Sequence, residues 1–515
     1  MSSYRKHYIF PVVIIIALSC FSTSTLSQVI YSPCEKSDFQ TYTTYPEMMQ
    51  YLQQVQSTST DMLLGIFGTS IEGREIPYAV FSRPMTTRPW EALVSGKPII
   101  LLTANIHGEE RTLRESNLIL IRELATKGTE MNQLLDSLVV IMVPSLNPDG
   151  FVLVTHQNAD RVDLNRDFIK LEQPELISHA KNIIHSWHPH LYADGHGGGR
   201  YPYNLCYQAP SNAAPDQRIT ALFDKEIAPF IDAKMKENGY KSWYFSRGNR
   251  TEWTTGIFDA DNGRNYGGFI NSVGILFESP GWQGLKNAVQ SGLVAYKALL
   301  QYSAVNAERL ITTINRARHE TTKMGQNTTG RIPVQMKLVA EDYKVSYEIG
   351  EGEGDKREII KVTDADLIKK PHILKSRPRP YAYILERKAY KSVEMLKRQN
   401  VMIEVLQEET TLGVEAYVLT GVTHGKKYDH HRATFVTVAD ETVKRTMTFP
   451  KGTYIIRTGQ MTGRVITHLL EPETNDNVIT FNTMDGILPK PGESSIIPIF
   501  KLMKPANLAT RMLRY

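Results

Sequence analysis

A chain of 515 residues, of which 41% are hydrophobic and 22% charged, has the composition of a globular protein and the length for two or three domains. The formal net charge of +5 is small for this length and is spread along the sequence, so we expect no nucleic-acid partner.

The first residues have the pattern of a secretory signal peptide. Arg, Lys and His at positions 5–7 precede an apolar core, Tyr8–Leu18, and small polar residues follow as far as Ser27. Because this core is too short to span a bilayer as a stable helix, we predict a cleavable signal at residues 1–27 and a secreted or periplasmic protein without stable membrane insertion. An uncleaved anchor and lipid attachment at Cys20 are the alternative interpretations.

Removal of that segment would leave two cysteines, Cys34 and Cys206. Two cysteines in an exported chain can pair, and the sequence leaves open whether these two do. Neither lies in a metal-ligand spacing. The sequence places no histidine beside Cys206, so we interpret it as a buried small residue rather than a nucleophile.

From Tyr45 to about Thr322 the sequence alternates strands with helices. This alternation predicts an α/β fold with a mostly parallel or mixed sheet flanked by helices, which we assign to a catalytic domain at residues 28–323. In chain order we predict a helix at 45–55, two strands within 64–81, a strand at 99–102 with a helix to 125, a strand at 138–143, a helix at 174–187, a strand before Asp194, a helix at 218–238, a strand at 273–277 and a long helix from Gly284.

Beyond Met324–Gly330 the pattern changes to short strands separated by glycine, proline and charged turns. We predict a β-rich accessory domain of unknown role at residues 331–515, with a helix at 392–398 and strands at 381–385, 401–406, 414–422, 453–457 and 496–500. The pair His430–His431 lies in a charged turn that we interpret as a solvated loop. His468 and Glu471 lie in a predicted strand, where residues three apart point to opposite faces.

The first candidate for chemistry lies between a predicted buried strand and the helix after it. Pro98 begins an unbroken apolar run, and His107-Gly-Glu-Glu110 follows it. In an open parallel sheet, polar groups at the carboxyl end of a central strand face the crevice where ligands bind. His107 and Glu110 are therefore candidate ligands of one metal ion.

Further polar clusters follow other strands of the same region. Asn147–Gly150 and Asp163–Asp167 follow one strand, His196 stands in a glycine-rich loop, and Glu278 ends an apolar strand. Two histidines and one carboxylate suit a catalytic zinc ion that keeps a position for water. A further carboxylate that binds no metal is what a general base requires.

Together and in this order, the motifs resemble those of the zinc carboxypeptidases of the carboxypeptidase A and T type. The matching pieces are a hairpin around Gly68–Arg74, then His-x-x-Glu, Asn-Pro-Asp-Gly, Asp-Leu-Asn-Arg, Asp-x-His and a final Leu-Phe-Glu-Ser. The likeness covers about residues 45–306. The order of six short motifs is far more specific than any one of them.

The resemblance implies a role for each residue of the zinc chemistry. His107, Glu110 and His196 would bind one zinc ion per chain. Glu278 would activate water for attack on a peptide or amide carbonyl.

The resemblance also implies how the substrate is held. Asn165 and Arg166 match the pair that binds the substrate's terminal carboxylate, for which the arginine fork is physically suited. Asp163 matches the aspartate that orients a ligand histidine and fixes its tautomer.

Three positions depart from the family pattern. Family members carry an arginine before Asp-Leu-Asn-Arg that polarises the scissile carbonyl, whereas the alignment here places His156, with Arg161 nearby. If His156 takes that role it must donate a proton, so activity would fall as it deprotonates. Glu109 stands where digestive members have arginine, which is closer to the branches that trim processed peptides or cell-wall peptides. For the tyrosine that caps the substrate, Tyr266 is our candidate.

We therefore predict a zinc metallocarboxypeptidase that hydrolyses C-terminal residues from peptides with a free C-terminus, with Glu278 as general base. One alternative keeps the zinc chemistry on another bond, as an amidase, endopeptidase or deacylase acting on cell-wall peptides or other amides. The other alternative is a catalytically inactive peptide-binding protein on the same fold.

Overall fold

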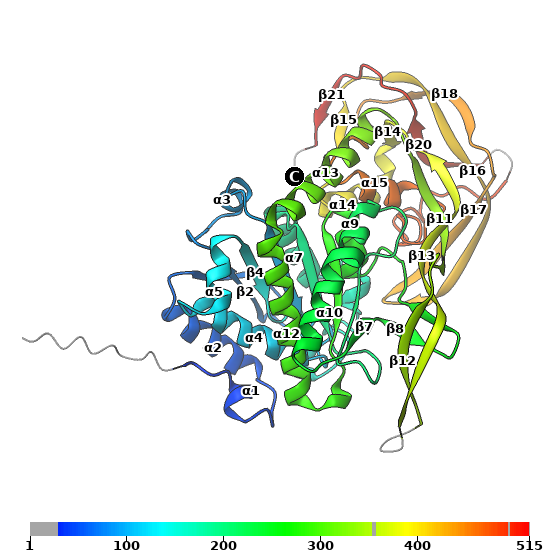
Figure 1. Ribbon diagram of the computed structural model, residues 1–515. Coiled ribbons are helices and arrows are strands. Elements are labelled where there is room, and N and C mark those ends of the chain that lie inside the picture. The colour runs from blue at the N-terminus through cyan, green and yellow to red at the C-terminus, as the bar shows by residue number, and fades with distance from the viewer. Residues whose placement is uncertain (1–28, 353–356, 493–494, 514–515) are drawn as a thin grey trace, which may run out of the picture. The chain divides into compact units, whose positions relative to one another are not determined.

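The computed structural model describes residues 29–352, 357–492 and 495–513 (Figure 1). The predicted signal at residues 1–27, with Cys20, lies outside the described residues. Among the residues that are described, no helix combines the length and the apolar character needed to cross a membrane. Cys34 and Cys206 are both buried, and neither forms a disulfide.

Eight strands form the first sheet, in the order β1-β2-β4-β3-β5-β10-β6-β7. The central strands β4, β3, β5 and β10 run parallel, whereas β1 with β2, β2 with β4 and β6 with β10 are antiparallel pairs. This mixed sheet confirms the predicted fold class. The strands are β1 (Met62–Thr69), β2 (Glu75–Phe81), β3 (Ile99–Ala104), β4 (Val139–Val143), β5 (Leu191–His196), β6 (Leu205–Gln208), β7 (Ser242–Tyr244) and β10 (Val273–Glu278).

Helices cover this sheet. The strands β3, β4, β5 and β10 are buried along their whole length, as expected of strands covered on both faces. The long α12 packs against α4 and α10 (Figure 1). The helices of this region are α1 (Pro33–Lys36), α2 (Tyr45–Ser57), α3 (Pro89–Val94), α4 (Thr112–Ala125), α5 (Glu130–Gln133), α6 (Pro148–Leu153), α7 (Pro174–His179), α8 (His185–Trp187), α9 (Gln217–Leu222), α10 (Ala228–Glu237), α11 (Gly263–Phe269), α12 (Leu285–Val305) and α13 (Ala307–Gln326).

A second sheet joins the two halves of the chain. Its order is β11-β13-β9-β8, and β12 pairs with β13. Because β13 comes from the C-terminal half and adds in parallel to β9, the chain from Tyr31 onward forms one compact unit. The predicted division into domains at residues 323–331 stays a prediction. The strands are β8 (Ser246–Gly248), β9 (Glu252–Thr255), β11 (Arg331–Ala340), β12 (Val345–Glu351) and β13 (Glu358–Pro378).

The third sheet forms the predicted β-rich C-terminal part. Its order is β17-β16-β20-β14-β19-β15-β21, and β18 pairs with β16. Helices α14 (Tyr390–Arg398) and α15 (Gly463–Leu470) accompany it. The strands are β14 (Ala382–Leu385), β15 (Glu404–Leu406), β16 (Thr410–Tyr428), β17 (His431–Val438), β18 (Val443–Phe449), β19 (Tyr454–Arg457), β20 (Ile496–Leu502) and β21 (Thr510–Met512).

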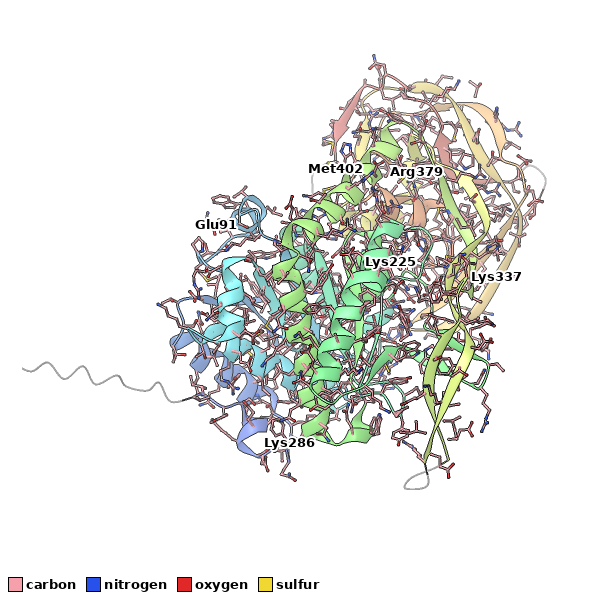
Figure 2. All side chains as sticks on the ribbon, in the orientation of Figure 1. Glu91, Lys225, Lys286, Lys337, Arg379 and Met402 are labelled. Carbon is pink, nitrogen blue, oxygen red and sulfur yellow. The ribbon has the colours of Figure 1, made fainter. Side chains whose placement is uncertain are left out.

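The predicted strand around His468 and Glu471 is wrong, because residues 463–470 form the helix α15. The buried residues 465, 466, 469 and 470 recur at helical spacing and pack into the core. Glu471 ends this helix and accepts hydrogen bonds from the Tyr383 hydroxyl (2.5 Å) and from Lys501 Nζ (2.7 Å). The buried Arg379, labelled in Figure 2, adds positive charge near this carboxylate. Glu471 therefore belongs to a buried structural cluster.

An ion pair links the third sheet to the segment before α7. His431 Nε2 in β17 lies 2.5 Å from Glu172 Oε2. The hydrogen bond that His431 donates to Glu172 raises the pKa of His431 above 6.5, although burial and the Lys170 charge act to lower it. Burial acts to raise the pKa of Glu172, but its hydrogen bond to His431 and the charges of His431, Lys170 and Arg398 lower it below 4.5.

The two shifts predict a pH-dependent contribution to stability. A raised histidine pKa stabilises the fold below its unfolded value of about 6.5 and loses that effect as the pH rises through the folded value. A lowered glutamate pKa stabilises the fold above about 4.3 and loses that effect as the pH falls. The pair is therefore strongest between these two values. We expect His431→Gln to lower the free energy of unfolding by about 0.5–1 kcal/mol near pH 5.5 and by less near pH 9.

Urea unfolding of both proteins at the two pH values measures this difference. The exposed His319 provides a matched control, since His319→Gln removes a histidine from the surface of α13. Equal losses for His431→Gln at both pH values would contradict a charged pair.

Candidate metal centre

The loop after β3 carries the first two candidate ligands. Asn105 has a left-handed backbone (φ 58°), and its side-chain amide donates to the carbonyl oxygens of His107 (2.9 Å) and Gly108 (3.0 Å). Gly108 lies so close to Gly150 that a Cβ atom at position 108 would be 1.9 Å from the Gly150 carbonyl carbon. Glycine at 108 is therefore required. These contacts fix the loop that ends at Glu110.

His196 reaches the same place from the neighbouring strand. It is the last residue of β5, which runs parallel to β3 with Ala104 opposite Gly195. His196 Nδ1 lies 3.2 Å from His107 Nδ1 and 2.9 Å from Glu110 Oε2, and His107 Nδ1 lies 2.9 Å from the same oxygen. The structure therefore brings together the three residues that the resemblance implied.

The other nitrogen of each ring faces a carboxylate. His107 Nε2 is 3.2 Å from Asp163 Oδ1, and His196 Nε2 is 2.9 Å from Asp194 Oδ2. A neutral imidazole carries its one proton on the nitrogen that donates to such a partner. Both Nδ1 lone pairs then point at each other and at the Glu110 carboxylate. Three acceptor atoms that converge in this way need a proton or a metal cation between them, and two nitrogens with one oxygen suit zinc.

Carboxylates dominate the electrostatics of the two candidate histidine ligands. Burial acts to lower the pKa of His107, but the charge of Glu110 and the hydrogen bond to Asp163 outweigh it and raise the pKa to about 9. Burial likewise opposes the charged form of His196, yet Asp194 and Glu110 raise its pKa well above 6.5. Burial acts to raise the pKa of the partly buried Glu110 carboxyl, but the two histidines hold it well below its usual range. Without a metal ion these carboxylates therefore favour protons on the two rings, and a metal ion that binds here would displace them.

Glu278 lies beside the three candidate ligands. It is the last residue of β10, directly opposite His196 in the parallel pair, and it is 6% exposed. The backbone N–H of Gly198 donates to its Oε2 atom (2.5 Å). Burial raises the pKa of Glu278 to about 7, and Glu110 adds to this effect, although His196 acts against it. A carboxyl with a pKa near neutrality is matched to accepting and returning a proton.

Asn165 and Arg166 lie in the loop that starts at Asp163. The Asp163 side chain accepts the N–H of Asn165 (2.8 Å), so one carboxylate supports both this loop and His107. The Asn165 amide oxygen accepts the N–H of Gly263 at the start of α11 (2.9 Å). Arg166 is 32% exposed at its side chain and lies 3.8 Å from Asp261 Oδ2.

His156 lies against the candidate ligands. Its ring stacks on that of His107, with the ring centroids 3.6 Å apart. His156 Nδ1 is 2.8 Å from Glu109 Oε1, and its Nε2 is 3.6 Å from Asp163 Oδ2. These carboxylates raise the pKa of His156, with the Asp163 hydrogen bond the largest cause. Both ring nitrogens thus face carboxylates, while Arg161 is exposed.

The structure does not bring Tyr266 to this site. Tyr266 is buried within α11, and its hydroxyl donates to Gln399 Oε1 (2.8 Å) and lies 3.4 Å from His185 Nε2. The Tyr266 ring packs on Phe168 in the core, and this packing sets the direction in which its hydroxyl points. The sequence does not show which way such a short helix faces.

Sequence reasoning assigned no role to three groups at the site, although one of them, Asp194, is the aspartate of the Asp-x-His motif. Asp194 was detectable, because residues two apart in a strand share a face and Asp194 precedes His196 by two. The N–H of Gly198 carries no side-chain signal. Arg264 is buried, and its Nε atom has no hydrogen-bond partner among the described residues. Burial lowers its pKa to about 10, and the Arg166 charge adds to this, while Asp261 and Glu278 oppose it.

Comparison with known proteins points to one family. The sequence profile of the zinc carboxypeptidase family matches residues 48–261. Carboxypeptidase 2 of Trichophyton equinum is 26% identical over 465 residues, which cover 84% of this chain and 81% of that protein. Carboxypeptidase E of Caenorhabditis elegans is 36% identical over 122 residues, or 20% of this chain and 25% of that protein. A metallo-carboxypeptidase structure from Burkholderia cenocepacia overlaps 51% of this chain and 70% of its own, at 20% identity and a TM-score of 0.42.

Proposed function

We propose that this chain, which belongs to the zinc carboxypeptidase family, removes residues from the free carboxyl end of peptides outside the cytoplasm. The observation that supports this most directly is the convergence of His107 Nδ1, His196 Nδ1 and Glu110 Oε2, within 3.2 Å of one another, beside the buried Glu278. These three residues would hold one zinc ion. When bound, zinc polarises a substrate carbonyl and lowers the pKa of a water molecule at the site.

Glu278 is the proposed proton carrier. The Gly198 N–H holds its Oε2 atom, which leaves Oε1 to accept a proton from the attacking water. The same carboxyl then returns the proton to the leaving amine. Burial raises the pKa of this carboxyl above its usual value, which makes it a stronger base toward the attacking water.

Arg166 and Asn165 are the proposed contacts for the substrate's terminal carboxylate. A guanidinium can donate two parallel hydrogen bonds to a carboxylate, which fixes both position and orientation. Asp163 supports this loop and His107 at the same time, so the carboxylate site and the metal site keep a constant separation. Such a fixed separation favours cleavage of the last peptide bond.

His156 is the proposed group that polarises the substrate carbonyl, but it can do so only if one of its ring nitrogens becomes free. Its two ring nitrogens face Glu109 and Asp163, so it would have to exchange one of these partners for the substrate oxygen. Tyr266 lies elsewhere, and we assign it no role in the reaction.

Digestion of a mixed peptide pool, followed by mass spectrometry, tests the function. We expect stepwise loss of residues from the carboxyl end, and we expect a zinc chelator to stop it and added zinc to restore it. Internal cleavage, or equal cleavage of peptides with amidated ends, would favour the endopeptidase or amidase alternative. A protein that binds zinc and cleaves nothing would favour the inactive binding protein.

Arg166→Gln provides the sharper test of the carboxylate contact. Loss of a charge-assisted hydrogen bond of about 1.5–3 kcal/mol should raise KM for a free-acid peptide by about 10- to 100-fold. The amidated form of the same peptide should change little. Arg316→Gln, an exposed arginine on α13, is the matched control. An equal change for both peptides would remove the role given to Arg166.

A further inference from the structure

The turn between β16 and β17 touches the loop that carries the proposed carboxylate contacts. Three consecutive residues of the turn make these contacts. Asp429 Oδ1 accepts the N–H of Asp163 (3.4 Å), His430 Nε2 donates to the Asp160 carbonyl oxygen (2.9 Å), and His431 Nε2 faces Glu172 (2.5 Å). The turn lies more than 250 residues from this loop in the sequence, so folding of the third sheet brings it there.

The backbone of the turn is set for this contact. Tyr428 pairs with His431, and the two residues between them, Asp429 and His430, have left-handed φ angles of 44° and 69°. Two left-handed residues define the tight hairpin turn whose twist matches the strands, in which Asn-Gly or Asp-Gly is usual. A histidine in the second position is unfavourable, and such strain is retained where the surroundings determine it. Here the surroundings include the loop from Asp160 to Glu172.

The Asp429 carboxylate interacts electrostatically with charged residues of the proposed substrate site. The charges of Lys170 and Arg166 act to lower its pKa, whereas burial, the largest effect, raises it. Its Oδ2 atom is buried and has no hydrogen-bond partner among the described residues. Asp429 therefore contributes one hydrogen bond to the Asp163 backbone, and its carboxylate interacts electrostatically with Lys170 and Arg166.

The same loop is held from a second direction. Gln399, at the end of α14, is fully buried and donates to the carbonyl oxygens of Phe168 (2.8 Å) and Ile169 (2.9 Å). Arg398 donates to the Lys170 carbonyl oxygen (3.1 Å). Residues of the C-terminal part thus contact the loop at its start, its middle and its end, and leave the Asn165–Arg166 segment between them.

We propose that the β16–β17 turn completes the substrate site, with Asp429 as a positioning residue that holds the Asp163 backbone, and through it the loop that carries Arg166, in place for the substrate's terminal carboxylate. This inference rests on the proposed function. It gives the C-terminal β-rich part a role in the reaction of the N-terminal part, because the turn supports the loop that carries the proposed carboxylate contacts.

The test compares peptide binding and turnover in Asp429 variants of the full chain. Asp429→Ala removes the hydrogen bond and the charge, and Asp429→Asn restores the hydrogen bond alone. We expect Asp429→Ala to raise KM for a free-acid peptide by about 3- to 10-fold, the loss of one hydrogen bond, with little change in kcat. Asp429→Asn should recover most of this loss. Zinc content should equal that of the wild type.

The control is Asp440→Ala, which changes an exposed aspartate in the turn after β17. A second readout avoids turnover: in a Glu278→Gln background, calorimetry should show the same 3- to 10-fold loss of affinity for the free-acid peptide and none for the amidated peptide. An unchanged affinity, or equal loss for both peptides, would overturn the role of Asp429. A wild type that does not distinguish the two peptides would instead overturn the proposed function.

Discussion

Glu278→Gln should lower kcat by about 10²- to 10⁴-fold, the usual contribution of a positioned general base. Glutamine has the shape of glutamate, and its amide oxygen can still accept the Gly198 N–H. It cannot take a proton from water. Because the change removes only the proton transfer, KM and zinc content should stay close to the wild-type values.

Glu441→Gln, an exposed glutamate before β18, is the matched control for this substitution. Rates should be measured with a free-acid peptide under saturating conditions, together with zinc content and the unfolding midpoint. A rate within about threefold of the wild type would show that another group accepts the proton, and His156, which stacks on His107, would be the first candidate to test.

The central sheet was predictable because its signals are local. The apolar run at residues 99–102 became β3, and the run at 273–277 became β10, each buried on both faces as the unbroken pattern predicts. The helix at 174–187 is also found, although a π-helical segment, Ala180–Ile184, divides it. Metal ligands at the ends of such strands follow from the strand assignments and the motif order.

The second sheet was not predictable, because long-range pairing determines it. The 21-residue β13 is rich in charged residues and partly exposed, so it lacks the alternation that marks a half-buried strand. It forms because β11, β12 and β9 supply partners from both sides. The segment at 463–470 was predicted wrongly because its β-branched residues, Val465, Ile466 and Thr467, favour a strand locally, whereas packing into the core favours the helix α15.

The direction of a side chain was the hardest property to predict. Tyr266 lies in a short segment that the sequence marks only by glycines. Its hydroxyl donates a hydrogen bond to Gln399 at the end of α14, which lies 133 residues later in the sequence. The contact between Asp429 and Asp163 is equally hard to predict, because nothing in the sequence around one residue indicates that it contacts the other. Such contacts depend on how the third sheet packs against the first.

His196→Ala should lower zinc affinity by more than about 100-fold, and Asp194→Asn by about 10- to 100-fold. Alanine removes one of three ligand atoms. Asparagine keeps an oxygen near His196 Nε2 but loses the charge that favours the proton on that nitrogen, so Nδ1 presents its lone pair to the metal less often. The two variants therefore test the ligand and its orientation separately. Activity should fall with zinc occupancy in both.

Competition with a chromophoric chelator measures the affinities, and circular dichroism establishes that the variants are folded. His319→Ala, on the exposed face of α13, is the control for loss of a histidine. Full zinc affinity in His196→Ala would mean that the three converging atoms do not share one cation. The close approach of His107 Nδ1 and His196 Nδ1, at 3.2 Å, would then need a proton between them, since two lone pairs without one repel.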